Sequence, residues 1–200
     1  MPRTVLFITH AEVEIDPAIP VPQGKLSEKG QRRHRLFNRA PGISGISAIY
    51  CSAERKAIDA AAILTEVVSV TTSIVEALRE NDRVATGYLP PAEFQTTADL
   101  FFAHPDRSVR GWEKAVDAQA RIVSAVRDIA ANDRTGGDIA ILAHGGVGAL
   151  LLCDILGVPI SRMHDQPGIG GGNLFSFDAV SWRLRHGWRD IGISFSTHPD

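Results

Sequence analysis

Two histidines follow two short segments that are rich in apolar residues. His10 comes directly after residues 3–9, and His144 comes directly after residues 138–143. Continuous runs of Val, Ile, Leu and Phe predict buried strands of a parallel sheet, and ligands bind at the carboxyl ends of such strands. We therefore expect two imidazoles at the same edge of one sheet. Because an imidazole can exchange protons near neutral pH or act as a nucleophile, the pair predicts a reactive site.

The segments that must position these histidines alternate between strand and helix patterns. Strands are predicted at residues 3–9, 46–51, 70–75 and 138–143, with a closing hairpin at 174–177 and 182–188. Helices are predicted at residues 28–39, 54–68, 92–104, 113–131 and 147–156. This alternation predicts an α/β fold, a three-layer sandwich with a mainly parallel central sheet flanked by helices. No linker divides the chain, so we expect a single domain over residues 1–200.

Composition narrows the class of protein. The chain has 200 residues, 44% hydrophobic and 22% charged, with a formal net charge of −2. These values are typical of a globular protein and disfavour a nucleic-acid partner. Two cysteines and no apolar run of membrane-spanning length predict a cytoplasmic protein without a membrane partner. No metal-ligand spacing is present, so we expect no metal or other cofactor.

The order of several short motifs resembles the histidine phosphatase superfamily, also called the phosphoglycerate mutase-like family. Each motif is weak alone, and the specificity lies in their order along the chain. They are Ile8-Thr9-His10-Ala11-Glu12, Leu26-Ser27-Glu28-Lys29-Gly30, Ile49-Tyr50-Cys51-Ser52-Ala53-Glu54-Arg55-Lys56-Ala57, Leu78-Arg79-Glu80, Ala143-His144-Gly145-Gly146 and a late Asn173. The resemblance implies a phosphoglycerate mutase-like fold and phosphoryl transfer through a phosphohistidine.

The resemblance also implies roles for individual residues. His10 matches the nucleophile, and Arg55 matches an arginine that binds the phosphate. His144 matches a second histidine that stabilises the phosphoryl charge, and the N–H of Gly145 is expected to donate to the same group.

Two carboxylates compete for the part of proton donor to the leaving oxygen. Glu80 matches the acidic residue of the family, and Asp82 lies two residues further on. We prefer Glu80, because it stands at the position that matches the family. Asn173 matches a late polar position of the family near the site, where it is expected to bind substrate.

The first motif departs from the pattern of the family. The family carries Arg-His-Gly where this chain reads Thr9-His10-Ala11. A threonine hydroxyl cannot replace the charge or the donor fork of an arginine. The loss is worth about 3 kcal/mol of transition-state stabilisation in a dry site. The cations to consider as replacements are Arg3, Arg79 and Arg83.

These observations predict a phosphatase that acts on a phosphomonoester or a phosphohistidine protein. The alternative is a catalytically weak or inactive protein that binds a phosphorylated ligand with the same fold, and a mutase-type phosphotransferase is the third choice. The segment 87–110 is expected to cover the site. Its aromatic residues either line the mouth or form the core face of a helix; they are Tyr88, Phe94, Phe101 and Phe102. The substrate itself and the oligomeric state are not predicted.

Overall fold

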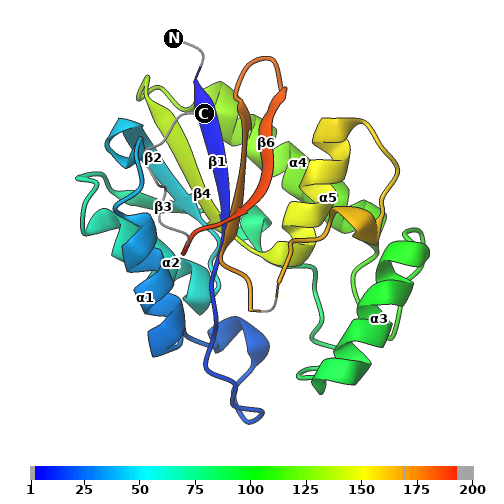
Figure 1. Ribbon diagram of the computed structural model, residues 1–200. Helices are drawn as coiled ribbons and strands as arrows, with labels where there is room; N and C mark the ends of the chain where they lie inside the picture. Colours follow the sequence, from blue (N-terminus) through cyan, green and yellow to red (C-terminus); the bar gives the residue numbers. More distant parts are fainter. Residues whose placement is uncertain (1–2, 169, 193–200) are drawn as a thin grey trace.

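A six-stranded sheet forms the centre of the protein in the computed structural model, which describes residues 3–168 and 170–192 (Figure 1). The strand order is β3-β2-β4-β1-β5-β6. β1 pairs in parallel with β4, β4 with β2 and β2 with β3, whereas β5 is antiparallel to both β1 and β6. The strands are β1 (Thr4–Thr9), β2 (Ile46–Cys51), β3 (Thr72–Ile74), β4 (Asp138–Ala143), β5 (Asn173–Asp178) and β6 (Leu184–Asp190).

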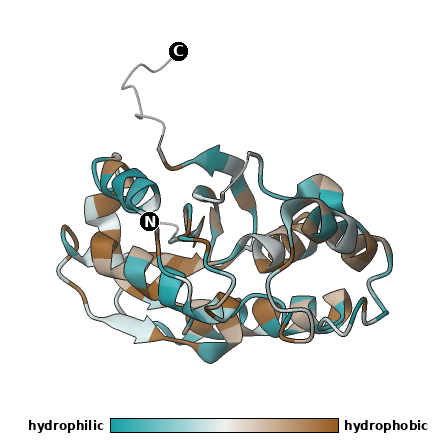
Figure 2. Cartoon of the chain, turned by 90° about the horizontal axis from the view of Figure 1, so that it is seen from below, coloured by the Kyte–Doolittle hydropathy of each residue, from teal (hydrophilic) through white to brown (hydrophobic). Residues whose placement is uncertain are grey.

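Helices cover both faces of this sheet. They are α1 (Glu28–Phe37), α2 (Arg55–Thr65), α3 (Pro91–Ala103), α4 (Ala115–Asn132) and α5 (Gly145–Leu156). α1 and α2 pack on one face and α4 and α5 on the other, while α3 lies to the side of the sheet (Figure 1). The helices carry both hydrophobic and hydrophilic residues (Figure 2). The predicted three-layer α/β sandwich with a mainly parallel sheet is therefore confirmed.

Alternation along β1 joins the two faces into one core. Ile8 packs with the residues of α1 and α2, whereas Val5 and Phe7 pack with those of α4 and α5. Successive side chains of a strand point to opposite faces, so a central strand with both faces covered is apolar almost throughout. Among the described residues, no helix is long and apolar enough to cross a membrane.

The boundaries differ from the prediction at α5. The helix was expected to begin at Val147, but it begins at Gly145, with His144 at the N-cap. The first N–H groups of a helix have no partner inside it. Here the Glu80 carboxylate accepts from the N–H groups of Gly146 and Val147. A side chain distant in sequence therefore satisfies two N–H groups of the first helical turn.

One glycine of α1 allows the chain after β1 to lie close to the helix. A Cβ on Gly30 would lie 2.3 Å from the backbone oxygen of Glu12. Alanine favours a helix interior over glycine by about 1 kcal/mol, but here the methyl group meets backbone that cannot yield. We expect Gly30→Ala to lower the free energy of unfolding by about 1–3 kcal/mol, as measured by urea denaturation.

Gly45→Ala is the matched control. Its new Cβ would lie in ordinary contact, 3.6 Å from an oxygen of Asp138. This variant is expected to stay within about 0.5 kcal/mol of the wild type. A Gly30→Ala protein as stable as the wild type would contradict the close packing of Glu12 on α1.

Candidate active site

His10 lies at the carboxyl end of β1 with its tautomer fixed by the backbone. Its Nδ1 is 2.9 Å from the carbonyl oxygen of Ala11. A carbonyl only accepts, so Nδ1 carries the proton and Nε2 keeps a free lone pair. Burial, His144 and Lys56 together hold the pKa of His10 well below its usual value. The imidazole is therefore neutral at pH 7, which is the form that can act as a nucleophile.

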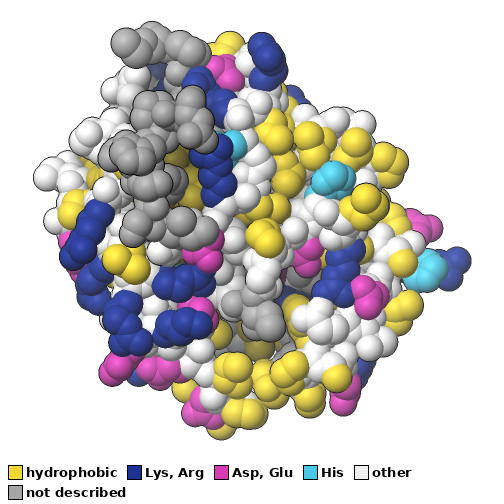
Figure 3. Space-filling model, in the orientation of Figure 1, with side chains coloured by type: hydrophobic (Ala, Val, Ile, Leu, Met, Phe, Trp, Pro, Cys, Tyr) yellow, Lys and Arg dark blue, Asp and Glu magenta, His cyan; other side chains and the backbone are white. Residues whose placement is uncertain are grey.

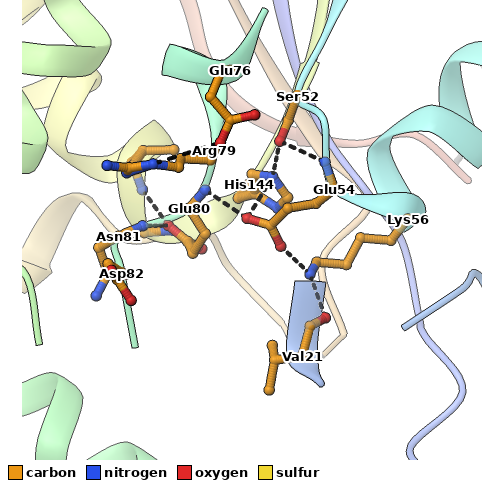
Figure 4. A network of polar contacts seen from close by, with 12 residues as sticks. Val21, Ser52, Glu54, Lys56, Glu76, Arg79, Glu80, Asn81, Asp82 and His144 are labelled. Atoms are coloured by element: carbon orange, nitrogen blue, oxygen red, sulfur yellow. Dashed lines mark hydrogen bonds and ion pairs between the residues drawn. The ribbon is translucent and has the colours of Figure 1, made fainter. Parts of the chain in front are cut away.

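His144 lies at the carboxyl end of β4 and is fully buried. Its ring centroid is 5.2 Å from that of His10, and the two rings meet edge to face. Its Nε2 is 2.9 Å from the hydroxyl of Ser52 and 3.4 Å from a carboxylate oxygen of Glu54 (Figure 4). Nδ1 has no hydrogen-bond partner. Burial lowers the pKa of His144 to about 4, against the opposing effect of Glu54 and Glu80.

A buried ion pair between Glu54 and Lys56 lies beside His144 (Figure 4). Lys56 Nζ also donates to the carbonyl of Val21 at 3.0 Å, and Glu54 accepts from the N–H of Glu80 at 2.9 Å. Although burial opposes ionisation, the charges of His144 and Lys56 and the hydrogen bond from Lys56 lower the pKa of Glu54 to about 2. The sequence prediction gave neither residue a role at the site. Together they place a cation and a compensating anion behind the two imidazoles.

Arg55, predicted to bind the phosphate, is not brought to the histidines. Its side chain is 60% exposed and pairs with Asp59 at 2.7 Å. Successive helical residues point about 100° apart, so Arg55 and Lys56 cannot share one face. The buried face of α2 contains Lys56, Ala60 and Leu64. That apolar spacing is the sequence signal that identifies Lys56 as the inward cation.

Glu80 is placed at the site, whereas Asp82 is exposed. The carboxylate of Glu80 accepts from Gly146 N at 3.1 Å and Val147 N at 2.9 Å, and pairs with Arg83 at 3.2 Å. Burial tends to raise its pKa, but Arg83, His144 and the Gly146 N–H lower it below the usual value. Glu80 is therefore a carboxylate in the free protein.

Thr9 links the end of β1 to the segment from Gln166 to Asn173 through hydrogen bonds. Its hydroxyl is fully buried, donates to Gln166 Oε1 at 2.7 Å and accepts from Asn173 N at 2.9 Å. The side chain of Asn173 donates to the same Gln166 oxygen and to the carbonyl of Pro167. Gln166 in turn lies over Gly145, where a Cβ would be 2.0 Å from its Nε2. Sequence reasoning missed Gln166, because no motif surrounds it.

The arginines considered as replacements for the one missing at Thr9 are already paired. Arg3 is at the opposite end of β1 and pairs with Asp133. Arg79 pairs with Glu76 and Glu113, and only Arg83 of the three lines the cavity at the histidines. The described residues include no group of three or more His, Cys, Asp or Glu side chains arranged to hold a metal ion.

A cavity of about 530 Å³ opens beside these groups, lined at its base by His10, Glu80, Gly145 and Gly146. Its walls are the chain after β1, the segment from Asn81 to Trp112, including α3, and a third group of residues from Arg162 to Gly168 with Gly170 and Gly171. Hydrophobic side chains lie along the lower edge of the molecule in Figure 3. A neutral nucleophile, a carboxylate and a helix N-terminus thus line one cavity, and a second, buried imidazole lies with its ring centroid 5.2 Å from that of the nucleophile. This arrangement can transfer an anionic group.

A further histidine holds the chain immediately after the nucleophile. The N–H of Ala11 donates to Nε2 of His34, 3.1 Å away, and burial lowers the pKa of His34 to about 3. The folded protein needs this ring neutral, whereas the unfolded chain binds a proton below about pH 6.5. Stability is therefore fully present above that pH and is lost as the pH falls toward 3.

We expect His34→Gln, whose amide oxygen can still accept, to lose less stability than the wild type between pH 6.5 and pH 4. The slope should be smaller by up to about 1.4 kcal/mol per pH unit in urea unfolding. His104→Gln, at an exposed position, is the control and should match the wild type. Equal slopes for all three proteins would contradict the role of His34.

Comparison with known proteins identifies the family. The family model of the histidine phosphatase superfamily (branch 1) matches residues 5–186, whereas a search of curated proteins found no match. A solved mycobacterial glucosyl-3-phosphoglycerate phosphatase with inorganic phosphate has a TM-score of 0.78 and 22% identity, covering 96% of this chain and 100% of that chain. YhfR from Bacillus stearothermophilus has a TM-score of 0.72 and 22% identity, covering 92% and 95%. A putative alpha-ribazole-5'-P phosphatase from Escherichia coli has a TM-score of 0.71 and 14% identity, covering 97% and 98%. These likenesses show the shared fold, and the family match over most of the chain shows that the protein belongs to the histidine phosphatase superfamily, branch 1.

Proposed function

We propose that this protein is a phosphatase that hydrolyses a phosphomonoester or a phosphohistidine through a phosphohistidine intermediate on His10. The observation that carries the proposal is the hydrogen bond from His10 Nδ1 to the carbonyl of Ala11. It leaves Nε2 as a neutral nucleophile in a residue that lines the cavity, beside His144. Family membership supports the same chemistry.

The first half-reaction transfers the phosphoryl group to the protein. The lone pair of His10 Nε2 forms a bond to phosphorus, and the bond from phosphorus to the leaving oxygen breaks. Glu80 gives that oxygen a proton. Because Glu80 is a carboxylate in the free protein, it acts as an acid once the nearby phosphate dianion raises its pKa. The groups proposed to stabilise the phosphoryl charge are Nδ1 of His144, which has no hydrogen-bond partner, and the N–H of Gly145 in the first turn of α5.

The second half-reaction regenerates the histidine. A water molecule gives a proton to the Glu80 carboxylate and attacks phosphorus, and the bond between phosphorus and Nε2 breaks. The electron pair returns to Nε2, and inorganic phosphate leaves. Splitting one displacement into two steps is the advantage of a covalent intermediate, and no metal ion is required for either step.

The second candidate is a protein that binds a phosphorylated ligand with little turnover. The pairing of cations favours it, since Lys56 is paired with Glu54 and Arg83 with Glu80. With Thr9 in place of an arginine, the site holds less positive charge for a transition state. Such a protein would bind phosphate or vanadate and turn over no phosphomonoester.

The distinguishing test is the covalent adduct. We expect the wild type, mixed with a reactive phosphodonor such as acetyl phosphate, to gain one acid-labile phosphate by intact mass, and His10→Ala to gain none. His104→Ala, at an exposed histidine, is the control and should label like the wild type. A folded wild type that binds vanadate and never labels would support the binding protein.

The role of Glu80 is tested with two leaving groups. A general acid matters most where the leaving oxygen is basic, so Glu80→Gln should lower kcat/KM for an alkyl phosphate by about 100-fold or more. The loss for p-nitrophenyl phosphate should be below about tenfold, because that leaving group needs no proton. Asp82→Asn is the control and should change neither value by more than about threefold. Equal losses of kcat/KM for both substrates in Glu80→Gln would show that Glu80 is not the general acid.

A further inference from the structure

We infer that the ligand of this site carries its phosphate on an apolar or aromatic group and has no second anionic group. The inference rests on the proposed function, because it concerns the part of the same ligand that projects away from His10. Three features of the cavity support it: an aliphatic wall, an aromatic wall and the pairing of its cations.

The aliphatic wall is the chain between β1 and α1. It places large hydrophobic side chains against the cavity with much of their surface uncovered, including Ile15 (67% exposed) and Ile19 (43% exposed). The segment is held in place by the bridge between Val13 and Leu26 and by the bond from Glu14 N to the carbonyl of Lys25. Solvent-exposed aliphatic side chains beside a reactive site favour a ligand with an apolar group that buries them.

The aromatic wall faces the cavity from the segment around α3. Phe94 and Trp112 lie 5.9 Å apart between ring centroids, and Tyr88 is exposed at the same wall. The Arg83 guanidinium lies over both rings, 5.2 Å from the centre of Phe94 and 5.4 Å from that of Trp112. This stacking fixes the aromatic surface, and an aromatic ligand gains from such a wall beyond the burial of area.

The cations of the cavity are not available to a second anion. Of the described residues that line it, only two are arginines, and both are paired. Arg83 pairs with Glu80, and Arg162 pairs with Asp99 and Asp165. A carboxylate or second phosphate on the ligand would therefore lose its hydration without gaining a free cation. The cavity favours one phosphate on an apolar body.

Calorimetry with phosphonates tests this without catalysis, since their carbon–phosphorus bond is not hydrolysed. We expect 2-naphthylmethylphosphonate to bind the wild type at least about tenfold more tightly than methylphosphonate, which corresponds to roughly 60 Å² of additional apolar burial. Phosphonoacetate, which adds a carboxylate, should bind no more tightly than methylphosphonate.

The variant that tests the wall is the double substitution Ile15→Ser with Ile19→Ser, at exposed positions whose change leaves the core intact. It should weaken binding of the naphthyl ligand at least about threefold and leave methylphosphonate unchanged. Val180→Ser, at an exposed position in the turn between β5 and β6, is the matched control.

Each outcome decides the inference. Equal affinities for the naphthyl and methyl ligands, tighter binding of phosphonoacetate, or no binding of any phosphonate would overturn it. The labelling of His10 is a separate readout. A labelled protein without a naphthyl preference would have the proposed chemistry and a different ligand class, whereas a naphthyl preference without labelling would identify the ligand class of a binding protein.

Discussion

The parallel pairing of β1 with β4 is the constraint on which the site depends. The register places Thr9 opposite Ala143, so the next residue of each strand is a histidine. Both strands are central in the sheet and covered on both faces. A shift of one residue would turn every side chain of β1 to the other face of the sheet. The same apolar burial that stabilises the fold therefore fixes the separation of the two imidazoles.

Around these histidines, charges are balanced within the protein. Glu54 compensates Lys56, and Glu80 compensates Arg83. Buried charges persist when each has a partner and hydrogen bonds. Both imidazoles are held neutral by burial and neighbouring cations. In the free site, the N–H groups of Gly146 and Val147 are bonded to Glu80, and Lys56 and Arg83 are paired with carboxylates.

The sequence was sufficient where the pattern reports burial directly. Apolar runs located β2 and β4 at residues 46–51 and 138–143, and the motif order indicated the fold and both histidines. It failed at two kinds of residue. Arg55 and Lys56 are adjacent cations, and matching the motif selected Arg55, although the apolar spacing of α2 turns Lys56 inward. Gln166 reaches the site from a loop with no local pattern, through contacts to Thr9 and Asn173.

Vanadate, which adopts the five-coordinate geometry of a phosphoryl group in transfer, gives the most direct test of the central claim. A crystal structure with vanadate should show vanadium bonded to His10 Nε2, with His144 Nδ1 and the first turn of α5 around its oxygens. Nδ1 of His10 should still donate to the Ala11 carbonyl. Vanadate bound elsewhere in the cavity, or a His10 ring turned so that Nδ1 faces vanadium, would contradict the account of His10 as the nucleophile.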